Sequence, residues 1–130
     1  MKGTHMRARK PEDLDRLFQE ALNAGKIDDL VALYEPQATL MPMPGKLVTG
    51  HAAIREALNG FLAGKPKISI APSVVAQSGD VAVVNGKWNL EVAGQDGKRT
   101  QMSAQEVVVA RRQADGRWLI AIDLPFGVGG

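Results

Sequence analysis

The sequence predicts a single α+β domain in which three N-terminal helices pack on a strongly curved, mostly antiparallel sheet. In the first third of the chain, apolar residues recur at helical spacing. The remainder consists of long β-rich runs joined by short turn segments. Helices followed by a run of strands are typical of an α+β architecture. A length of 130 residues fits one domain.

The helices are indicated by apolar stripes with spacings of three and four residues. The first should begin at Pro11, which suits a first helical turn, and should end at Gly25. A shorter helix is expected from Asp28 or Asp29 through Tyr34, and a third helix over 51–62. Acidic residues near the start of the first helix favour its positive end: Glu12, Asp13 and Asp15.

The strands are expected over 38–43, 68–77, 81–92, 99–112 and 117–124. The last four are separated by short glycine-containing segments, and such links force neighbouring strands to run antiparallel. Strands of about ten residues or more make a sheet twist and curl. Helices laid across a curled sheet enclose a concave space, where a small molecule would bind.

Composition excludes several classes of function. Sixteen basic and 14 acidic residues give a net charge of +2, too balanced for a nucleic-acid-binding surface. The chain has no cysteine and therefore no thiol nucleophile, disulfide or thiolate metal site. With no cysteine and His51 as the one histidine outside the tag-like segment, we expect no metal site. No glycine-rich phosphate loop follows a strand, and we expect no cofactor. Its longest fully apolar run is far shorter than the ~20 residues of a membrane span, and the expected location is cytoplasmic.

The domain boundaries follow from the two ends of the sequence. Residues 1–6 are typical of an expression-tag remnant. Residues 7–126 are expected to form the single domain. The glycine-rich segment 127–130 is expected to be a flexible tail.

Three segments resemble the ketosteroid-isomerase-like proteins of the NTF2-like superfamily. Residues 21–34, ALNAGKIDDLVALY, followed by QATL at 37–40, resemble the opening of these proteins. Residues 49–54, TGHAAI, resemble their glycine-led third helix. Residues 114–118, ADGRW, resemble the ending of the SnoaL-like and DUF4440 branches. The resemblance implies a cone-shaped (cystatin-like) α+β domain with an apolar pocket, and a homodimer formed through the sheet face.

The catalytic residues of the steroid isomerases do not all carry over. Those enzymes use an aspartate base and an oxyanion hole made of a tyrosine and a protonated aspartic acid. The position matching the tyrosine is Phe18, and the position matching the base is Pro42. Glu106 matches the second acid and is the one position that keeps an ionisable group. The steroid-isomerase mechanism therefore does not transfer.

Strand alternation singles out Glu106 independently of the resemblance. Every second residue from Thr100 to Ala110 points to one face, and Glu106 interrupts that largely apolar row. A carboxyl in apolar surroundings has a raised pKa and can act as an acid, a base or a hydrogen-bond donor. The alternative is a structural glutamate, tied to a strand arginine or to an indole N–H.

Asp123 is the second candidate catalytic residue. It could pair with Glu106 or bond Trp88 or Trp118. It could instead fix the C-terminal turn, because aspartate before proline is common turn chemistry.

The remaining candidate site residues are large apolar side chains that could line the pocket, and ordinary core packing is the alternative for the tryptophans and methionines. They are Phe18, Leu22, Leu40, Pro42, Met43, Phe61, Trp88, Met102 and Trp118.

Three functions compete. The first is a cofactor-free isomerase, cyclase or dehydratase that transfers a proton on a small hydrophobic carbonyl compound. The second is a non-catalytic ligand-binding module. The third is a dimeric interaction module whose pocket is filled by its own aromatic side chains.

Overall fold

The computed structural model describes residues 7–94 and 96–128, apart from the side chains of 73 and 74. The predicted tag remnant, and residues 129 and 130 of the predicted tail, lie outside the described residues. The elements, in chain order, are α1 (Asp13–Ala24), α2 (Ile27–Val31), β1 (Tyr34–Met43), β2 (Lys46–Thr49), α3 (His51–Leu62), β3 (Lys67–Ser78), β4 (Val81–Ala93), β5 (Arg99–Arg112) and β6 (Trp118–Leu124). None of the helices described is long and apolar enough to cross a membrane.

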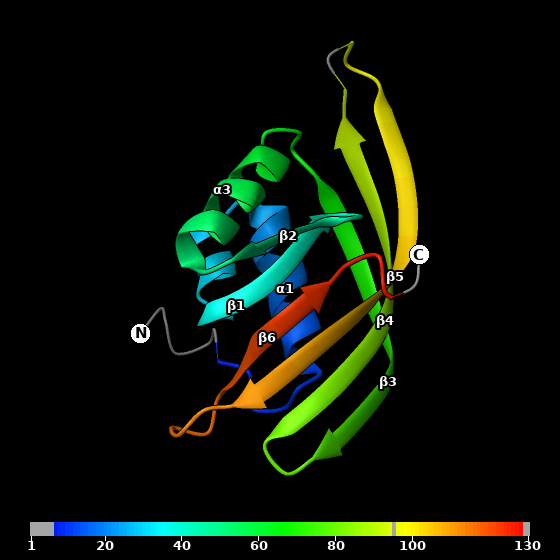
Figure 1. Ribbon diagram of the computed structural model, residues 1–130. Coiled ribbons are helices and arrows are strands. Elements are labelled where there is room, and N and C mark those ends of the chain that lie inside the picture. Colours follow the sequence, from blue (N-terminus) through cyan, green and yellow to red (C-terminus); the bar gives the residue numbers. More distant parts are fainter. Residues whose placement is uncertain (1–6, 95, 129–130) are drawn as a thin grey trace.

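The strands form one curved sheet in the order β2-β1-β6-β5-β4-β3 (Figure 1). Every neighbouring pair is antiparallel except β1 and β6, which run parallel. The helices lie on one side of the sheet, α1 against β3 and α3 against β1. The predicted α+β class, with helices on a curved and mostly antiparallel sheet, is confirmed.

Helix α1 follows its predicted stripe. Leu14, Leu17, Ala21 and Leu22 are buried against the sheet. Gly25 ends the helix in the left-handed conformation, with φ of 70°, and its N–H bonds the carbonyl groups of the last turn. The buried stripe and the end of the helix at Gly25 were both predicted from local sequence patterns, and the structure confirms both.

The second predicted helix is wrong at its C-terminal end. Helix α2 stops at Val31, and the chain enters β1 at Tyr34 because Tyr34 pairs with Ile120 of β6. Pro36 therefore lies inside a strand instead of ending a helix. It sits where the β1–β6 register shifts, a location that tolerates a residue without an N–H group.

Strand β2 was not predicted at all. Its four residues form a hairpin with β1, closed by the turn at Gly45, whose φ is 83°. A run this short carries too little alternation to be recognised from sequence. The hairpin matters because it forms one edge of the cavity described below.

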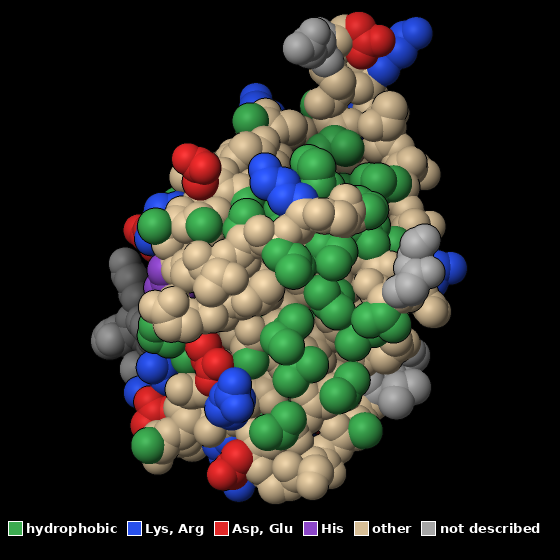
Figure 2. Space-filling model, in the orientation of Figure 1, with side chains coloured by type: hydrophobic (Ala, Val, Ile, Leu, Met, Phe, Trp, Pro, Cys, Tyr) green, Lys and Arg blue, Asp and Glu red, His purple; other side chains and the backbone are tan. Residues whose placement is uncertain are grey.

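The outer face of the sheet carries a row of half-exposed apolar side chains. Val83, Val109 and Ile122 lie in register across β4, β5 and β6. Val83 and Ile122 are 41% and 39% exposed. Figure 2 shows apolar side chains gathered in a band on this face. The homodimer predicted from sequence stays a prediction, and this row is where it would form.

We therefore expect the double substitution Val83→Lys and Ile122→Lys to convert a dimer into a monomer, because it places like charges in an apolar contact. Sedimentation velocity measures the change. The control is Asn89→Lys with Ser103→Lys, which adds the same charge on the polar part of the same face. A monomeric wild-type chain would contradict the prediction, and so would a dimer that survives the valine and isoleucine changes.

Candidate functional site

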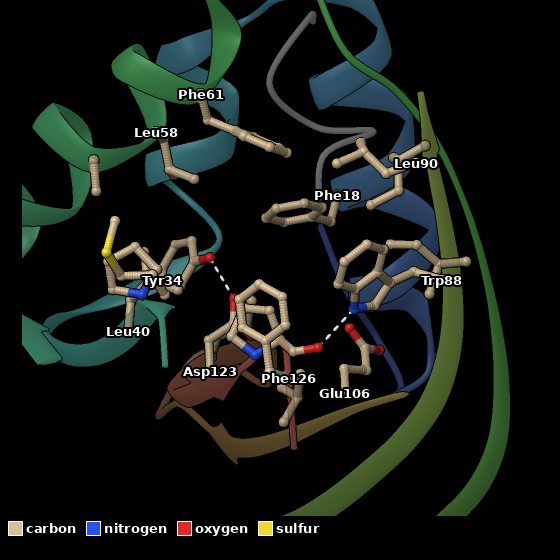
Figure 3. A pocket seen from close by; sticks show the side chains of 18 of the residues that line it. Phe18, Tyr34, Leu40, Leu58, Phe61, Trp88, Leu90, Glu106, Asp123 and Phe126 are labelled. Atoms are coloured by element: carbon tan, nitrogen blue, oxygen red, sulfur yellow. Dashed lines mark hydrogen bonds between the residues drawn. The ribbon is translucent and has the colours of Figure 1, made fainter. Parts of the chain in front are cut away.

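A cavity of about 400 Å³ lies between α1, α3 and the inner face of the sheet. Most of its lining is apolar, and Figure 3 shows Phe18 and Phe61 facing Trp88 and Phe126 across the space. The cavity exists because α1 and α3 cover only part of the curved inner face. Such an enclosed apolar space with a few polar groups is typical of small-molecule sites.

Most residues predicted from sequence for the site lie in this lining. The structure brings together Glu106, Asp123, Phe18, Leu40, Pro42, Met43, Phe61, Trp88 and Met102. Two predicted residues do not reach it. Leu22 is 1% exposed and packs in the core between α1 and the sheet. Trp118 is buried at the start of β6, with the Arg112 guanidinium 5.8 Å from its ring centroid.

Glu106 points inward from β5, as strand alternation predicts, and is 6% exposed. The position opposite on β4 is Gly86. A Cβ atom at Gly86 would lie 3.1 Å from Glu106 Oε2 and 3.1 Å from the carbonyl oxygen of Ala71. The missing side chain therefore provides the room that the Glu106 carboxyl occupies.

Asp15 of α1 is one of two buried polar site residues that sequence reasoning missed, and Tyr34 is the other. The place of Asp15 at the start of the helix favoured an interaction with the helix dipole, but the side chain is 5% exposed and lines the cavity beside Glu106. One oxygen of each carboxyl, Asp15 Oδ2 and Glu106 Oε2, is buried without a hydrogen-bond partner among the described residues. Two adjacent carboxyl groups need a proton between them to satisfy one another.

Burial is the main electrostatic effect on this pair. It raises the pKa of Glu106 to about 10, helped by the hydrogen bond and repulsion from Asp15 and by the more distant Asp123. Burial also raises the pKa of Asp15, while the hydrogen bond with Glu106 opposes the rise. Glu106 therefore holds a proton at neutral pH, beside a second carboxyl whose pKa is also raised.

Neither alternative predicted for a structural Glu106 is present. Among residues 7–94 and 96–128, no arginine forms an ion pair with this carboxyl. The Trp88 indole N–H donates instead to the Pro125 carbonyl at 2.7 Å, and the Phe126 ring packs edge-on against Trp88. Trp88 is thus fixed as a wall of the cavity, and its donor group is already used.

Asp123 and Tyr34 form a second polar group in the cavity. The Tyr34 hydroxyl donates to Asp123 Oδ2 at 2.6 Å, as Figure 3 shows. Burial raises the pKa of Asp123 to about 6, although the Tyr34 hydrogen bond opposes the rise. The same burial raises the Tyr34 pKa well above its usual value, so Tyr34 remains a donor. The predicted partners of Asp123 did not include this tyrosine.

The position of Tyr34 is fixed by a contact from α3. His51 Nε2 lies 2.8 Å from the Tyr34 carbonyl oxygen. A carbonyl oxygen can only accept, so the hydrogen is on Nε2. This bond joins the start of α3 to β1, and the parallel pairing with Ile120 holds β1 to β6. Both attachments position the tyrosine whose hydroxyl reaches Asp123.

No group of three His, Cys, Asp or Glu side chains suited to a metal ion occurs among the described residues. The polar groups of the cavity include the carboxyl groups of Asp15, Glu106 and Asp123. They can donate a proton, accept one, or hydrogen bond an oxygen of a bound molecule.

Comparison with protein families and structures agrees with the geometry. The model of the SnoaL-like domain matches residues 14–120. Comparison with curated proteins found no match. The DUF4440 branch stays a prediction.

Solved structures show the same fold. A ketosteroid isomerase-like protein from Erwinia carotovora atroseptica is 23% identical, with a TM-score of 0.76 over 86% of this chain and 88% of that chain. A protein of the NTF2-like family from Streptomyces avermitilis, described as a candidate dehydratase, is 17% identical, with a TM-score of 0.74 over 85% and 89%. A candidate calcium/calmodulin-dependent protein kinase II association domain from Xanthomonas campestris is 27% identical, with a TM-score of 0.73 over 82% and 77%.

The raised pKa of Glu106 should make the free energy of unfolding depend on pH. Between pH 4.5 and about 10, folded Glu106 keeps a proton that the unfolded chain has released. The free energy of unfolding therefore falls as pH rises through this window, with a limiting slope of about 1.4 kcal/mol per pH unit. Glu106→Gln cannot titrate. Its free energy of unfolding should therefore rise relative to wild type between pH 5 and pH 9, as measured by urea denaturation.

The control is Glu56→Gln, which removes an exposed carboxyl from α3. Its free energy of unfolding, relative to wild type, should stay nearly constant over the same pH range. A constant difference for Glu106→Gln as well would show that Glu106 titrates normally in the folded state.

Proposed function

Because the chain belongs to the SnoaL-like domain family, we propose that it binds a small, largely apolar carbonyl compound and transfers a proton on it. Proteins of this fold include a ketosteroid isomerase-like protein and a candidate dehydratase. The observation that carries the proposal is the buried Glu106–Asp15 pair, which presents a protonated carboxyl to an apolar cavity. The reaction class is isomerase-type or lyase-type and needs no cofactor.

Glu106 acts as the acid. Its proton hydrogen bonds the carbonyl oxygen of the bound compound and passes to it as negative charge develops there. Asp15 is a positioning residue, because its buried carboxyl lies beside that of Glu106 and orients it toward the bound carbonyl. Removing one donor of this kind lowers rates by about 10²-fold or more in enzymes that stabilise an oxyanion.

Asp123 acts as the base. With a pKa of about 6, it is mostly ionised at neutral pH and can accept a proton from carbon next to the carbonyl. The C–H bond breaks, its proton moves to Asp123, and the Glu106 proton moves to oxygen, giving an enol. Asp123 then returns its proton at another, conjugated carbon while the enol O–H gives its proton back to Glu106, which completes an isomerisation. In a dehydration, Asp123 instead gives its proton to a departing β-hydroxyl group, which leaves as water while the enol O–H gives its proton back to Glu106. Tyr34 positions Asp123 through the 2.6 Å hydrogen bond.

This assignment differs from that of the steroid isomerases. Phe18 and Pro42 line the cavity where the resemblance implies a tyrosine and a base, and neither side chain can donate or accept a proton. In this assignment the base lies on the last strand, at Asp123, Glu106 keeps the place of the second acid, and an additional carboxyl comes from the first helix, at Asp15.

A non-catalytic binding module is the second candidate function. It is favoured by the Tyr34 hydrogen bond, which already engages one oxygen of Asp123 and would weaken that group as a base. The same cavity would then hold a ligand by its apolar walls and by one hydrogen bond from Glu106. The predicted cytoplasmic location stays a prediction under both functions.

The test follows hydrogen–deuterium exchange at the α-carbons of 2-tetralone in D₂O by NMR. We expect wild-type protein to accelerate exchange over buffer, and Glu106→Gln to lower the acceleration by about 10²-fold. Glu56→Gln, which removes an exposed carboxyl outside the cavity, should keep the full rate. Exchange at the buffer rate, together with thermal stabilisation by 2-naphthol, would support the non-catalytic module instead.

A further inference from the structure

The cavity is electrically polarised along its depth. Its buried end holds three acidic side chains, Asp15, Glu106 and Asp123, each 5% or 6% exposed. Lys46 is the one basic residue in the described lining and belongs to the exposed β1–β2 hairpin. The acids therefore lie in a buried part of the lining, and the lysine lies in a part that is exposed to water.

Lys46 has no ion-pair partner in the part of the chain that the structure describes. Its neighbours at the rim are apolar, since Met43 and Met102 are 54% and 48% exposed. A lysine of this kind rests its aliphatic stem on the apolar rim and holds its charge in the water just outside.

We propose that the ligand of this cavity is amphipathic: an apolar body with a neutral oxygen at its inner end and a carboxylate at its outer end, beside Lys46. The inference rests on the proposed function and narrows its substrate class to carboxylate-bearing carbonyl compounds.

The same charges fix the direction in which the ligand enters. A carboxylate placed at the inner end would lose its hydration and face Asp15 and Asp123, both of which resist further negative charge. At the outer end it keeps most of its water and meets a cation. The inner end accepts a neutral oxygen because Glu106 presents a proton.

The experiment measures binding of three probes with the same ring system by calorimetry: 2-naphthol, 6-hydroxy-2-naphthoate and the shape-matched 6-hydroxy-2-naphthamide. We expect wild-type protein to bind the acid two- to fivefold more tightly than the amide, the usual strength of one exposed ion pair. The preference should vanish in Lys46→Gln, reverse in Lys46→Glu, and shrink at high salt. The control Lys87→Glu makes the same change from lysine to glutamate on the outer face of β4, and it should leave the preference for the acid over the amide unchanged.

The outcomes separate the two proposals. Binding of all three probes with equal affinity for acid and amide, or a preference unchanged by both Lys46 variants, overturns the carboxylate assignment and leaves the proposed function intact. If folded wild-type protein binds none of the probes, both the ligand-binding function and the carboxylate assignment fail.

Discussion

The main constraint on this structure is the electrostatic cost of holding three carboxyl groups inside one apolar cavity. Asp15, Glu106 and Asp123 come from α1, β5 and β6, and in the described part of the chain none of them is ion-paired. Desolvated charges of one sign repel and cannot all remain ionised. The negative charge of these groups is therefore reduced by protonation and by hydrogen bonding and, among the described residues, not by a neighbouring cation. Glu106 keeps a proton, and Asp123 is relieved by the Tyr34 hydroxyl.

Backbone features of the fold make this arrangement sterically feasible. Gly86 leaves open the space that the Glu106 carboxyl fills. The parallel pairing of β1 with β6 brings Tyr34 to Asp123 across 89 positions of sequence. Burying these acids lowers the stability of the folded chain at neutral pH, and buried acids with raised pKa values mark a candidate functional site. The same three acids thus lower the stability of the fold and provide the polar groups of the candidate site.

The sequence predicted what local patterns encode and missed what tertiary pairing decides. Alternation along β5 correctly predicted that Glu106 points inward, and helical spacing correctly predicted the buried stripe of α1. Asp15 was missed because an acid in a first helical turn usually serves the helix dipole. Its position three residues before Phe18 placed it on the cavity side, and that was the available signal. Tyr34 was missed because its strand exists through pairing with β6. Leu22 and Trp118 were expected in the lining because size and hydrophobicity do not distinguish a core residue from a cavity wall.

The most direct test of the account is the protonation state of Glu106. Infrared spectra of protein labelled with ¹³C at the glutamate side-chain carboxyl, compared between wild type and Glu106→Gln at pH 7.5, isolate the signal of this group. We expect a C=O stretch of a protonated carboxylic acid in wild type that is absent from the variant and shifts with the label. A difference spectrum containing only carboxylate bands would contradict it, because Glu106 would then be ionised and unable to donate a proton to a ligand.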